Sequence, residues 1–354
     1  MFLDPAGPVT VQRFEEVAYP KLQKFERIAR GFFWDPEEVS LTKDKADMKT
    51  ADEATAWAFT KTILRQTALD SLQGRAPALV FGPVASVPEV ELIASNWSFF
   101  ETNIHSASYS HIIRNVYNVP KDQFNSLHDI QPIIDMAAGV GRYYDDLHNI
   151  NSRVALIEAG EKGIRPVTEK EHIKAIWLAL NASYALECIR FLSSFLISLG
   201  MKENRIFMGN GNIIELILQD ELLHTDWTAY LINQVVKDDP RFAQAKIDCA
   251  DEVYAMYLEV IREEKDWAPY LFQKGPVVGV NTKIAHDFID HRATVCLKDI
   301  GIKYLENPIK NNPATWFNKY LESSKQPALQ ETENTSYVLN AMTTNVRHDE
   351  LPDI

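Results

Sequence analysis

Acidic side chains lie on otherwise apolar faces of several predicted helices, and this placement limits the folds that the chain can adopt. The segment QDELLH at 219–224 puts Glu221 and His224 three residues apart, on one face of a helix. The same face carries Ile214 and Ile217 in the preceding turns, so it points into apolar surroundings. An unpartnered carboxylate is costly to bury, and the fold must therefore place positive charge beside Glu221.

Three other helical segments repeat this pattern. Glu187 shares a face with Phe191 and Phe195, and Asp70 lies on the apolar face of an earlier helix. A further segment, ETNIHSASY at 101–109, places an acid and a His one turn apart. The complete set is four carboxylates and two imidazoles on four long helices: Asp70, Glu101, His105, Glu187, Glu221 and His224.

This set matches the ligands of two divalent metal ions. Four negative charges balance two doubly charged cations, and carboxylate oxygens with one imidazole per ion suit iron or manganese. Dinuclear helical bundles take one acid from each of two helices and Glu-x-x-His from each of the other two. Each residue alone could be an ordinary polar contact, but the order and spacing of the set favour a dinuclear centre in a four-helix core. We expect two iron ions, with manganese or a mixed pair as the alternative.

The rest of the chain predicts an all-α fold. Only 14 glycines occur, and apolar residues recur at the i, i+3, i+4 and i+7 positions of a helix. No internal repeat or linker divides residues 20–320, so we expect one helical domain over 1–321 and a polar, acidic, flexible tail over 322–354. The predicted helices span about 20–31, 50–73, 88–116, 129–151, 168–199, 211–236, 240–265 and 281–300.

Charge and cysteine content exclude several classes of protein. A net charge of -13 argues against binding to nucleic acid or to an anionic membrane surface. Three widely spaced cysteines without a CxxC pair predict neither a disulfide framework nor a zinc site, and they fit a reducing cytoplasm. No run approaches the roughly 18 apolar residues of a membrane span. We therefore expect a soluble, cytoplasmic protein without a signal peptide.

Several segments resemble the small, radical-generating subunit of class I ribonucleotide reductase. They are FFWDPEEV at 32–39, ALDSLQGRAP at 68–77, IHSASYSHIIRN at 104–115, ALECIRF at 185–191, QDELLH at 219–224, EEKDWAPYLF at 263–272 and TSYVL at 335–339. The resemblance implies a ferritin-like fold, a homodimer, and a dinuclear metal centre that reacts with oxygen to form a tyrosyl radical. It also implies that this radical passes to a separate large subunit, which docks on the C-terminal tail and reduces ribonucleotides to deoxyribonucleotides.

The same resemblance implies roles for individual residues. Asp70, Glu187, Glu221 and His224 match metal ligands, and Tyr109 matches the radical tyrosine. The apolar pocket that shields the radical corresponds to Phe191, Phe195, Ile214 and Ile217. The path of the oxidising equivalent corresponds to Trp34, Asp220 and, in the tail, Tyr337.

One turn departs from the family pattern. The usual Glu-x-x-His would require an acid at position 102, where this chain has Thr102. The spacing from Trp97 to Glu101 and that from His105 to the tyrosine four residues later are both as expected, so one residue is inserted between Glu101 and His105. An inserted residue is commonly absorbed as a π-bulge. We predict such a bulge, with Glu101 facing the metals; the alternative is that Thr102 faces them.

Two other functions fit parts of the pattern. A ferritin-like di-metal ligand-binding oxidase would share the fold, but Asp70 as the first ligand and the TSYVL segment argue against it. A metal-free helical bundle that acts as an interaction protein would not need buried acids that face Phe and Ile side chains.

Overall fold

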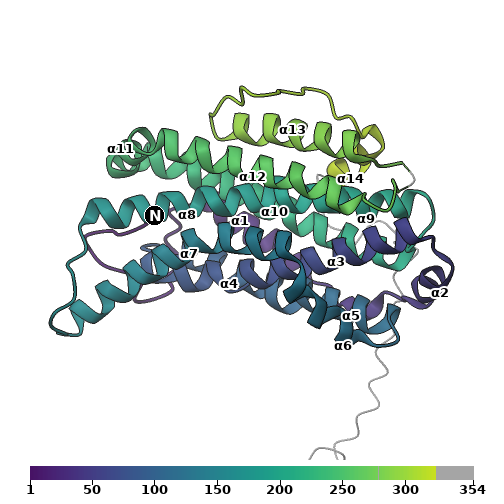
Figure 1. Ribbon diagram of the computed structural model, residues 1–354. Coiled ribbons are helices and arrows are strands. Elements are labelled where there is room, and N and C mark those ends of the chain that lie inside the picture. The colour runs from purple at the N-terminus through teal and green to yellow at the C-terminus, as the bar shows by residue number, and fades with distance from the viewer. Residues whose placement is uncertain (278, 324–354) are drawn as a thin grey trace, which may run out of the picture.

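The computed structural model of this chain describes residues 1–277 and 279–323, and these residues are predominantly helical. Figure 1 shows long helices packed side by side, with α12 and α13 lying across one side of the others. Within the described ranges, the β-structure consists of two isolated bridges, Phe2 with Ala85 and Val277 with Val280. The α-helices are α1 (Pro20–Gly31), α2 (Thr42–Thr50), α3 (Glu53–Gln73), α4 (Pro88–Phe99), α5 (Ser106–Val116), α6 (Pro120–Ser126), α7 (Gln131–Glu158), α8 (Glu169–Ala185), α9 (Leu192–Glu203), α10 (Met208–Asp238), α11 (Pro240–Asp248), α12 (Ala250–Leu271), α13 (Thr282–Asp299) and α14 (Asn318–Ser323).

The all-α prediction is confirmed, with clear differences at three of the predicted helices. The helix expected over 129–151 forms α7 and continues to Glu158. The helix expected over 50–73 begins at Glu53, because the Asp52 side chain accepts a hydrogen bond from the Thr55 backbone N–H at 2.7 Å and caps α3. The segment 240–265 forms two helices that meet at Cys249, and Asp251 and Glu252 supply the negative charge favoured in the first turn of α12.

Four helical rods form the centre of the molecule. Two of them, α3 and α10, are single helices, whereas each of the other two contains a π-helical turn. The turn Phe100–His105 joins α4 to α5, and the turn Leu186–Phe191 joins α8 to α9. The prediction of one continuous helix over 88–116 is therefore confirmed, and each rod contributes residues to the predicted metal centre.

The rod Glu169–Glu203 has the length and hydropathy of a membrane-spanning helix. However, 94% of its most apolar window is buried inside the molecule. Its apolar character is that of a core helix, because its side chains face the neighbouring helices on all sides.

A buried ion network ties two of the four rods to α12. Arg65 of α3 donates to Glu264 at 2.7 Å, and Arg190 donates to the same carboxylate at 3.1 Å. Arg190 also donates to Glu263 at 2.6 Å, and the guanidinium carbon of Arg65 lies 4.9 Å from the centre of the Trp267 ring. Since Arg65 lies close to the Asp70 position in α3 and Arg190 belongs to the same π turn as the Glu187 ligand, this network fixes the positions of both segments.

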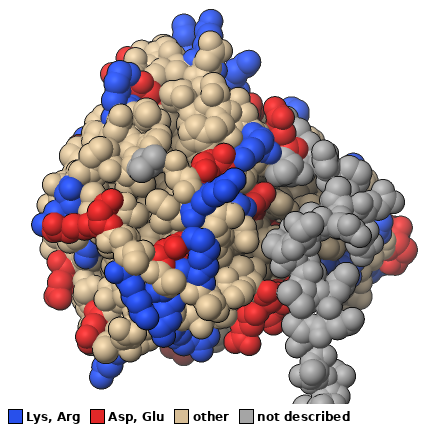
Figure 2. All heavy atoms as spheres, turned by 90° about the vertical axis from the view of Figure 1, so that its right-hand side faces the viewer, with Lys and Arg blue, Asp and Glu red and all other residues tan. Residues whose placement is uncertain are grey.

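The outer surface carries charges of both signs. Figure 2 shows the end of the bundle at the right of Figure 1, where Lys and Arg side chains alternate with Asp and Glu. Pairs such as Lys43 with Asp47 at 2.5 Å and Lys319 with Glu203 at 2.5 Å neutralise each other. The negative net charge is therefore not gathered into one acidic patch on this face.

The ion network predicts a large stability difference between two glutamates of α12. We expect Glu264→Gln to lower the free energy of unfolding by about 3–5 kcal/mol, because it leaves the buried Arg65 guanidinium without a carboxylate and removes one of the two carboxylates that Arg190 contacts. Denaturant titration followed by circular dichroism measures this loss. The matched control is Glu259→Gln, whose partner Arg142 is 46% exposed, and its loss should stay below about 1 kcal/mol. Equal losses in the two variants would contradict the role of the network.

Candidate metal centre

The predicted ligands come together as two overlapping groups of four residues. Asp70, Glu101, His105 and Glu221 form one group, and Glu101, Glu187, Glu221 and His224 form the other. In each group, one ligand atom per residue lies within 4.8 Å of all the others. Each group thus contains one His and one acid of its own, while Glu101 and Glu221 are shared. Each group could hold one divalent ion, and Glu101 and Glu221 could contribute to both sites.

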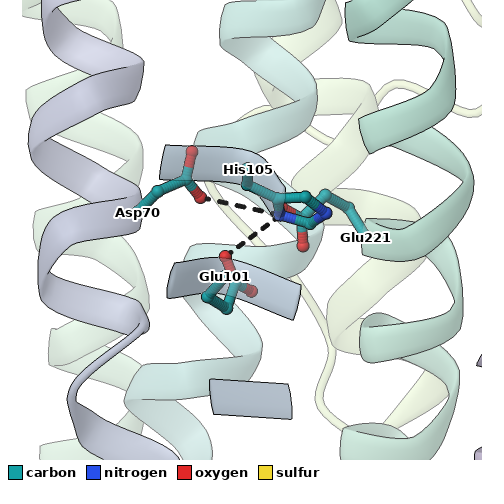
Figure 3. A group of neighbouring side chains, drawn as sticks. All are labelled: Asp70, Glu101, His105 and Glu221. Atoms are coloured by element: carbon teal, nitrogen blue, oxygen red, sulfur yellow. Dashed lines mark hydrogen bonds and ion pairs between the residues drawn. The ribbon is translucent and has the colours of Figure 1, made fainter. Parts of the chain in front are cut away.

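The side chains in each group converge on one point. Nδ1 of His105 lies 3.2 Å from Glu101, 3.2 Å from Glu221 and 4.0 Å from Asp70. Figure 3 shows these four side chains pointing toward one another from three separate helical segments. In the second group, Nδ1 of His224 lies 3.0 Å from both shared acids and 3.8 Å from Glu187.

Burial and missing partners make this set suited to metal ions. All six side chains are at most 1% exposed. Among residues 1–277 and 279–323, no hydrogen-bond partner lies at either carboxylate oxygen of Asp70, at Oε2 of Glu187 or at Oε1 of Glu221. Buried oxygens without a donor are strongly disfavoured in a protein interior, and divalent cations would satisfy all of them.

The pKa shifts of the clustered acids also favour the binding of cations. Burial, reinforced by the charge of Glu101, raises the pKa of Asp70 well above its ordinary value. Burial and the same neighbour raise the pKa of Glu221 to about 7. Burial would also raise the pKa of Glu101, but the neighbouring His105 and His224 lower it overall. Without a cation the shifts favour protonation of Asp70 and Glu221, and divalent cations would favour the ionised form of both acids.

The predicted π-bulge is confirmed at Phe100–His105. Glu101 is fully buried in the ligand set, whereas Thr102 and Asn103 are exposed. The π turn accommodates the extra residue, so Glu101 and His105 both face the cluster and α5 continues beyond them as a regular helix. Of the two alternatives, Glu101 rather than Thr102 faces the cluster.

Thr102 packs against the end of α3 instead. A Cβ atom added to Gly74 would lie 2.6 Å from the Thr102 hydroxyl oxygen and 3.2 Å from its backbone nitrogen. Gly74 follows the last residue of α3, and its N–H donates to the carbonyl of Asp70 at 2.8 Å. The absence of a side chain at position 74 thus lets the π turn approach the helix that carries Asp70.

A hydrogen-bonded chain connects the cluster to Trp34. The Trp34 indole N–H donates to Oδ2 of Asp220 at 3.0 Å, and Nε2 of His105 lies 3.1 Å from the same oxygen. A proton on Nε2 leaves Nδ1 of His105 as the nitrogen that faces the acids. Hydrogen bonds therefore join Trp34 and His105 through Asp220, and all three residues are buried.

Tyr109 lies one turn beyond His105 and is fully buried. Its hydroxyl has no hydrogen-bond partner in the part of the chain that the structure describes. Burial and the nearby charge of Asp70 raise its pKa well above the ordinary value. The four predicted pocket residues are all 0% exposed: Phe191, Phe195, Ile214 and Ile217. Tyr337 lies outside the described residues.

Several residues that hold the cluster were not predicted from the sequence. Trp97 donates to Glu187 at 2.9 Å and to Glu101 at 3.2 Å, and Gln73 donates to Glu187 at 2.6 Å. Gln73 follows the first ligand of α3 by three residues, so a search for buried polar residues on the same helix face would have found it. Tyr144, which bonds to Gln73, comes from α7, and no local pattern links it to the cluster.

The fold and the cluster define a helical carboxylate protein of the dinuclear type, and comparison with known proteins narrows the class. Residues 12–313 match the family "Ribonucleotide reductase, small chain". The chain is 35% identical over 351 residues to the ribonucleoside-diphosphate reductase 1 subunit beta of Escherichia coli O157:H7, covering 97% of this chain and 93% of that one. It is 34% identical to the ribonucleoside-diphosphate reductase subunit beta of Enterobacteria phage T4, covering 89% of this chain and 86% of that one.

Solved structures show the same fold. The ribonucleotide reductase R2 subunit of Clostridium botulinum aligns with a TM-score of 0.75 and 20% identity, over 88% of this chain and 92% of that one. A Streptococcus sanguinis protein described as dimanganese(II)-NrdF aligns with a TM-score of 0.69 and 18% identity, over 87% of this chain and 98% of that one. The predicted ferritin-like fold is thereby confirmed.

This chain belongs to the ribonucleotide reductase small-chain family. It is the small subunit of an oxidoreductase, and subunits of this kind work together with a large subunit.

The contact between Gly74 and the π turn predicts opposite effects for two Gly→Ala substitutions. We expect Gly74→Ala to lower the free energy of unfolding by about 1–3 kcal/mol, because the new Cβ overpacks against Thr102. Gly141 lies within α7, and a Cβ added there would meet nothing within 4 Å, so Gly141→Ala should stabilise by about 0.5–1 kcal/mol. Denaturant titration of both variants measures the difference, and a stabilising Gly74→Ala would refute the close approach.

Proposed function

We propose that this chain is the radical-generating subunit of a class I ribonucleotide reductase that acts on ribonucleoside diphosphates, as the names of its relatives state for those proteins. The observation that carries the proposal is the pair of overlapping ligand groups beside a fully buried tyrosine without a hydrogen-bond partner. The 35% identity to a reductase beta subunit supports the same function.

The cluster would hold two ions, iron or manganese. Asp70 and His105 would hold one ion and Glu187 and His224 the other, and Glu101 and Glu221 belong to both groups. Four carboxylates neutralise two divalent charges, and the unpartnered oxygens become ligands. When bound, the ions would supply the oxidising power, with oxygen as the oxidant, that removes one electron from the buried tyrosine. A dimanganese(II) relative in the same fold supports manganese as an alternative to iron.

The protein would form and protect the radical through its own side chains. Tyr109 would lose its phenolic proton toward the acids on the Asp70 side as it is oxidised, since burial and those charges disfavour a lasting phenolate. Phe191, Phe195 and Ile214 would keep water and reductants away from the ring, because they are fully buried apolar side chains.

The oxidising equivalent would then leave the subunit along the chain from His105 through Asp220 to Trp34. The shared oxygen of Asp220 would accept hydrogen bonds from both rings and so fix the position of the proton on each ring nitrogen.

We propose that Tyr337 receives the oxidising equivalent and that residues 322–354 form a tail that docks on the large subunit. We propose that residues 1–321 form one domain. We also propose a homodimer in the cytoplasm.

Replacing Tyr109 should separate metal binding from radical formation. After loading with Fe(II) or Mn(II) and exposure to oxygen, we expect the wild type to show two metal ions per chain and a tyrosyl signal in electron paramagnetic resonance. Tyr109→Phe should keep both ions and lose the signal, because the ring lacks an oxidisable hydroxyl. Tyr257→Phe, which changes an equally buried tyrosine on α12, is the control and should keep the signal. A tyrosyl signal that persists in Tyr109→Phe would show that another tyrosine carries the radical.

Truncation before residue 325 should separate radical formation from turnover. We expect the truncated subunit to form the radical at wild-type yield and to lose nucleotide reduction with the large subunit, because docking and transfer depend on the tail. Tyr337→Phe in the full-length chain should lose turnover while still competing with the wild type for the large subunit. Normal turnover by either variant would contradict the role of the tail tyrosine.

A further inference from the structure

Asp70 and Glu187 each belong to one ligand group only, and the protein holds them differently. Oε1 of Glu187 accepts two hydrogen bonds, from Gln73 at 2.6 Å and from the Trp97 indole at 2.9 Å. Neither oxygen of Asp70 has a hydrogen-bond partner. Hydrogen-bond donors therefore fix the position of the Glu187 carboxylate, whereas no donor fixes the Asp70 carboxylate.

Gln73 is in turn held by a tyrosine from a different helix. The Tyr144 hydroxyl of α7 donates to Oε1 of Gln73 and lies 2.8 Å from the hydroxyl oxygen of Ser183. Gln73 is 0% and Tyr144 is 5% exposed, so bulk water does not compete for these hydrogen bonds. Three elements, α3, α7 and α8, thus meet in a single chain of hydrogen bonds that ends on Glu187.

The direction of this chain follows from the chemistry of its ends. An ionised carboxylate only accepts hydrogen bonds, so the NH₂ group of Gln73 must face Glu187. The amide oxygen of Gln73 must then face Tyr144, and the single phenolic proton of Tyr144 must be donated to it. Without the Tyr144 hydroxyl, the amide could turn over and direct its oxygen at the carboxylate, where both atoms would only accept.

We propose that Gln73 and Tyr144 are positioning residues for one of the two metal ions. They occupy Oε1 of Glu187 with a fixed donor, so that Oε2, which lies 3.8 Å from Nδ1 of His224 and has no hydrogen-bond partner, is the oxygen presented to the ion. This inference rests on the proposed function, because it assumes that the cluster binds metal.

The two buried tyrosines near the cluster then have different roles. The proton of Tyr144 is committed to an amide oxygen, which is a very weak base, so this phenol cannot readily release it. The Tyr109 hydroxyl has no such partner. Loss of the Tyr109 hydroxyl should therefore leave metal binding intact, whereas loss of the Tyr144 hydroxyl should weaken it.

Titration of the metal-free, full-length protein with Mn(II) tests the proposal, with free aqueous Mn(II) quantified by electron paramagnetic resonance. We expect the wild type to bind two ions per chain. Gln73→Leu should lower the affinity for one of the two ions by about 10–100-fold and leave the affinity for the other unchanged. A loss of this size is usual when a group that orients a metal ligand is removed. Tyr144→Phe removes only one oxygen atom and should lower the affinity for the same ion.

Tyr257→Phe is the matched control, because it removes an equally buried hydroxyl that bonds to the Asn181 carbonyl at 3.2 Å. It should bind both ions as the wild type does. The double variant Gln73→Leu/Tyr144→Phe should match Gln73→Leu alone, because Tyr144 acts only through Gln73.

Three results would count against the inference, and they are distinguishable. If the wild type binds two ions and the Gln73 and Tyr144 variants bind both with unchanged affinity, the positioning role is wrong and the proposed function stands. If the wild type binds no Mn(II) and no Fe(II), both proposals fail. If the losses of affinity add in the double variant, Tyr144 acts independently of Gln73, and the proposal that it acts through Gln73 is wrong.

Discussion

Four carboxylates and two imidazoles share a region of the core from which water is excluded, and much of the structure serves to hold them there. Burial and mutual repulsion raise the pKa of several of the acids, so the set favours cations strongly. Such a cluster is stable only if its helices cannot move apart. The buried guanidinium groups of Arg65 and Arg190 meet this need, because they join α3 and the rod of Glu187 to α12.

The two sides of the cluster differ in how firmly the protein holds their carboxylates. On the side of Glu187 and His224, Trp97 and Gln73 donate to the carboxylate, and the His224 ring stacks on Trp227 with centroids 4.5 Å apart. On the other side, Asp70 has no hydrogen bond, and the phenol of Tyr109 lies nearby. The part of the centre that adjoins the proposed radical site is thus the part whose carboxylate can change its orientation at the lowest cost.

The sequence was sufficient to predict the six clustered residues, because acids on apolar helix faces are rarely stable without a cation beside them. The π turn at Phe100–His105 was also predictable, since the family pattern places an acid three residues before the His and this chain places Glu101 four residues before His105. The π turn at Leu186–Phe191 was not predicted, because Glu187 has no second ligand nearby against which a shift could be measured. Tyr144 was inaccessible for a different reason: its partner is 71 residues away, and only the packing of α7 on α3 brings them together.

The position of the inserted residue determines whether the clustered side chains keep their directions. Each residue turns an α-helix by about 100°, so an uncompensated insertion would rotate everything beyond it away from its partners. Here the extra residue lies between Glu101 and His105, and the wide turn absorbs it before the helix reaches Tyr109. The same insertion a few positions later would separate His105 from Tyr109 and direct the phenol elsewhere. Length variation among relatives should therefore be acceptable before His105 and excluded between His105 and Tyr109.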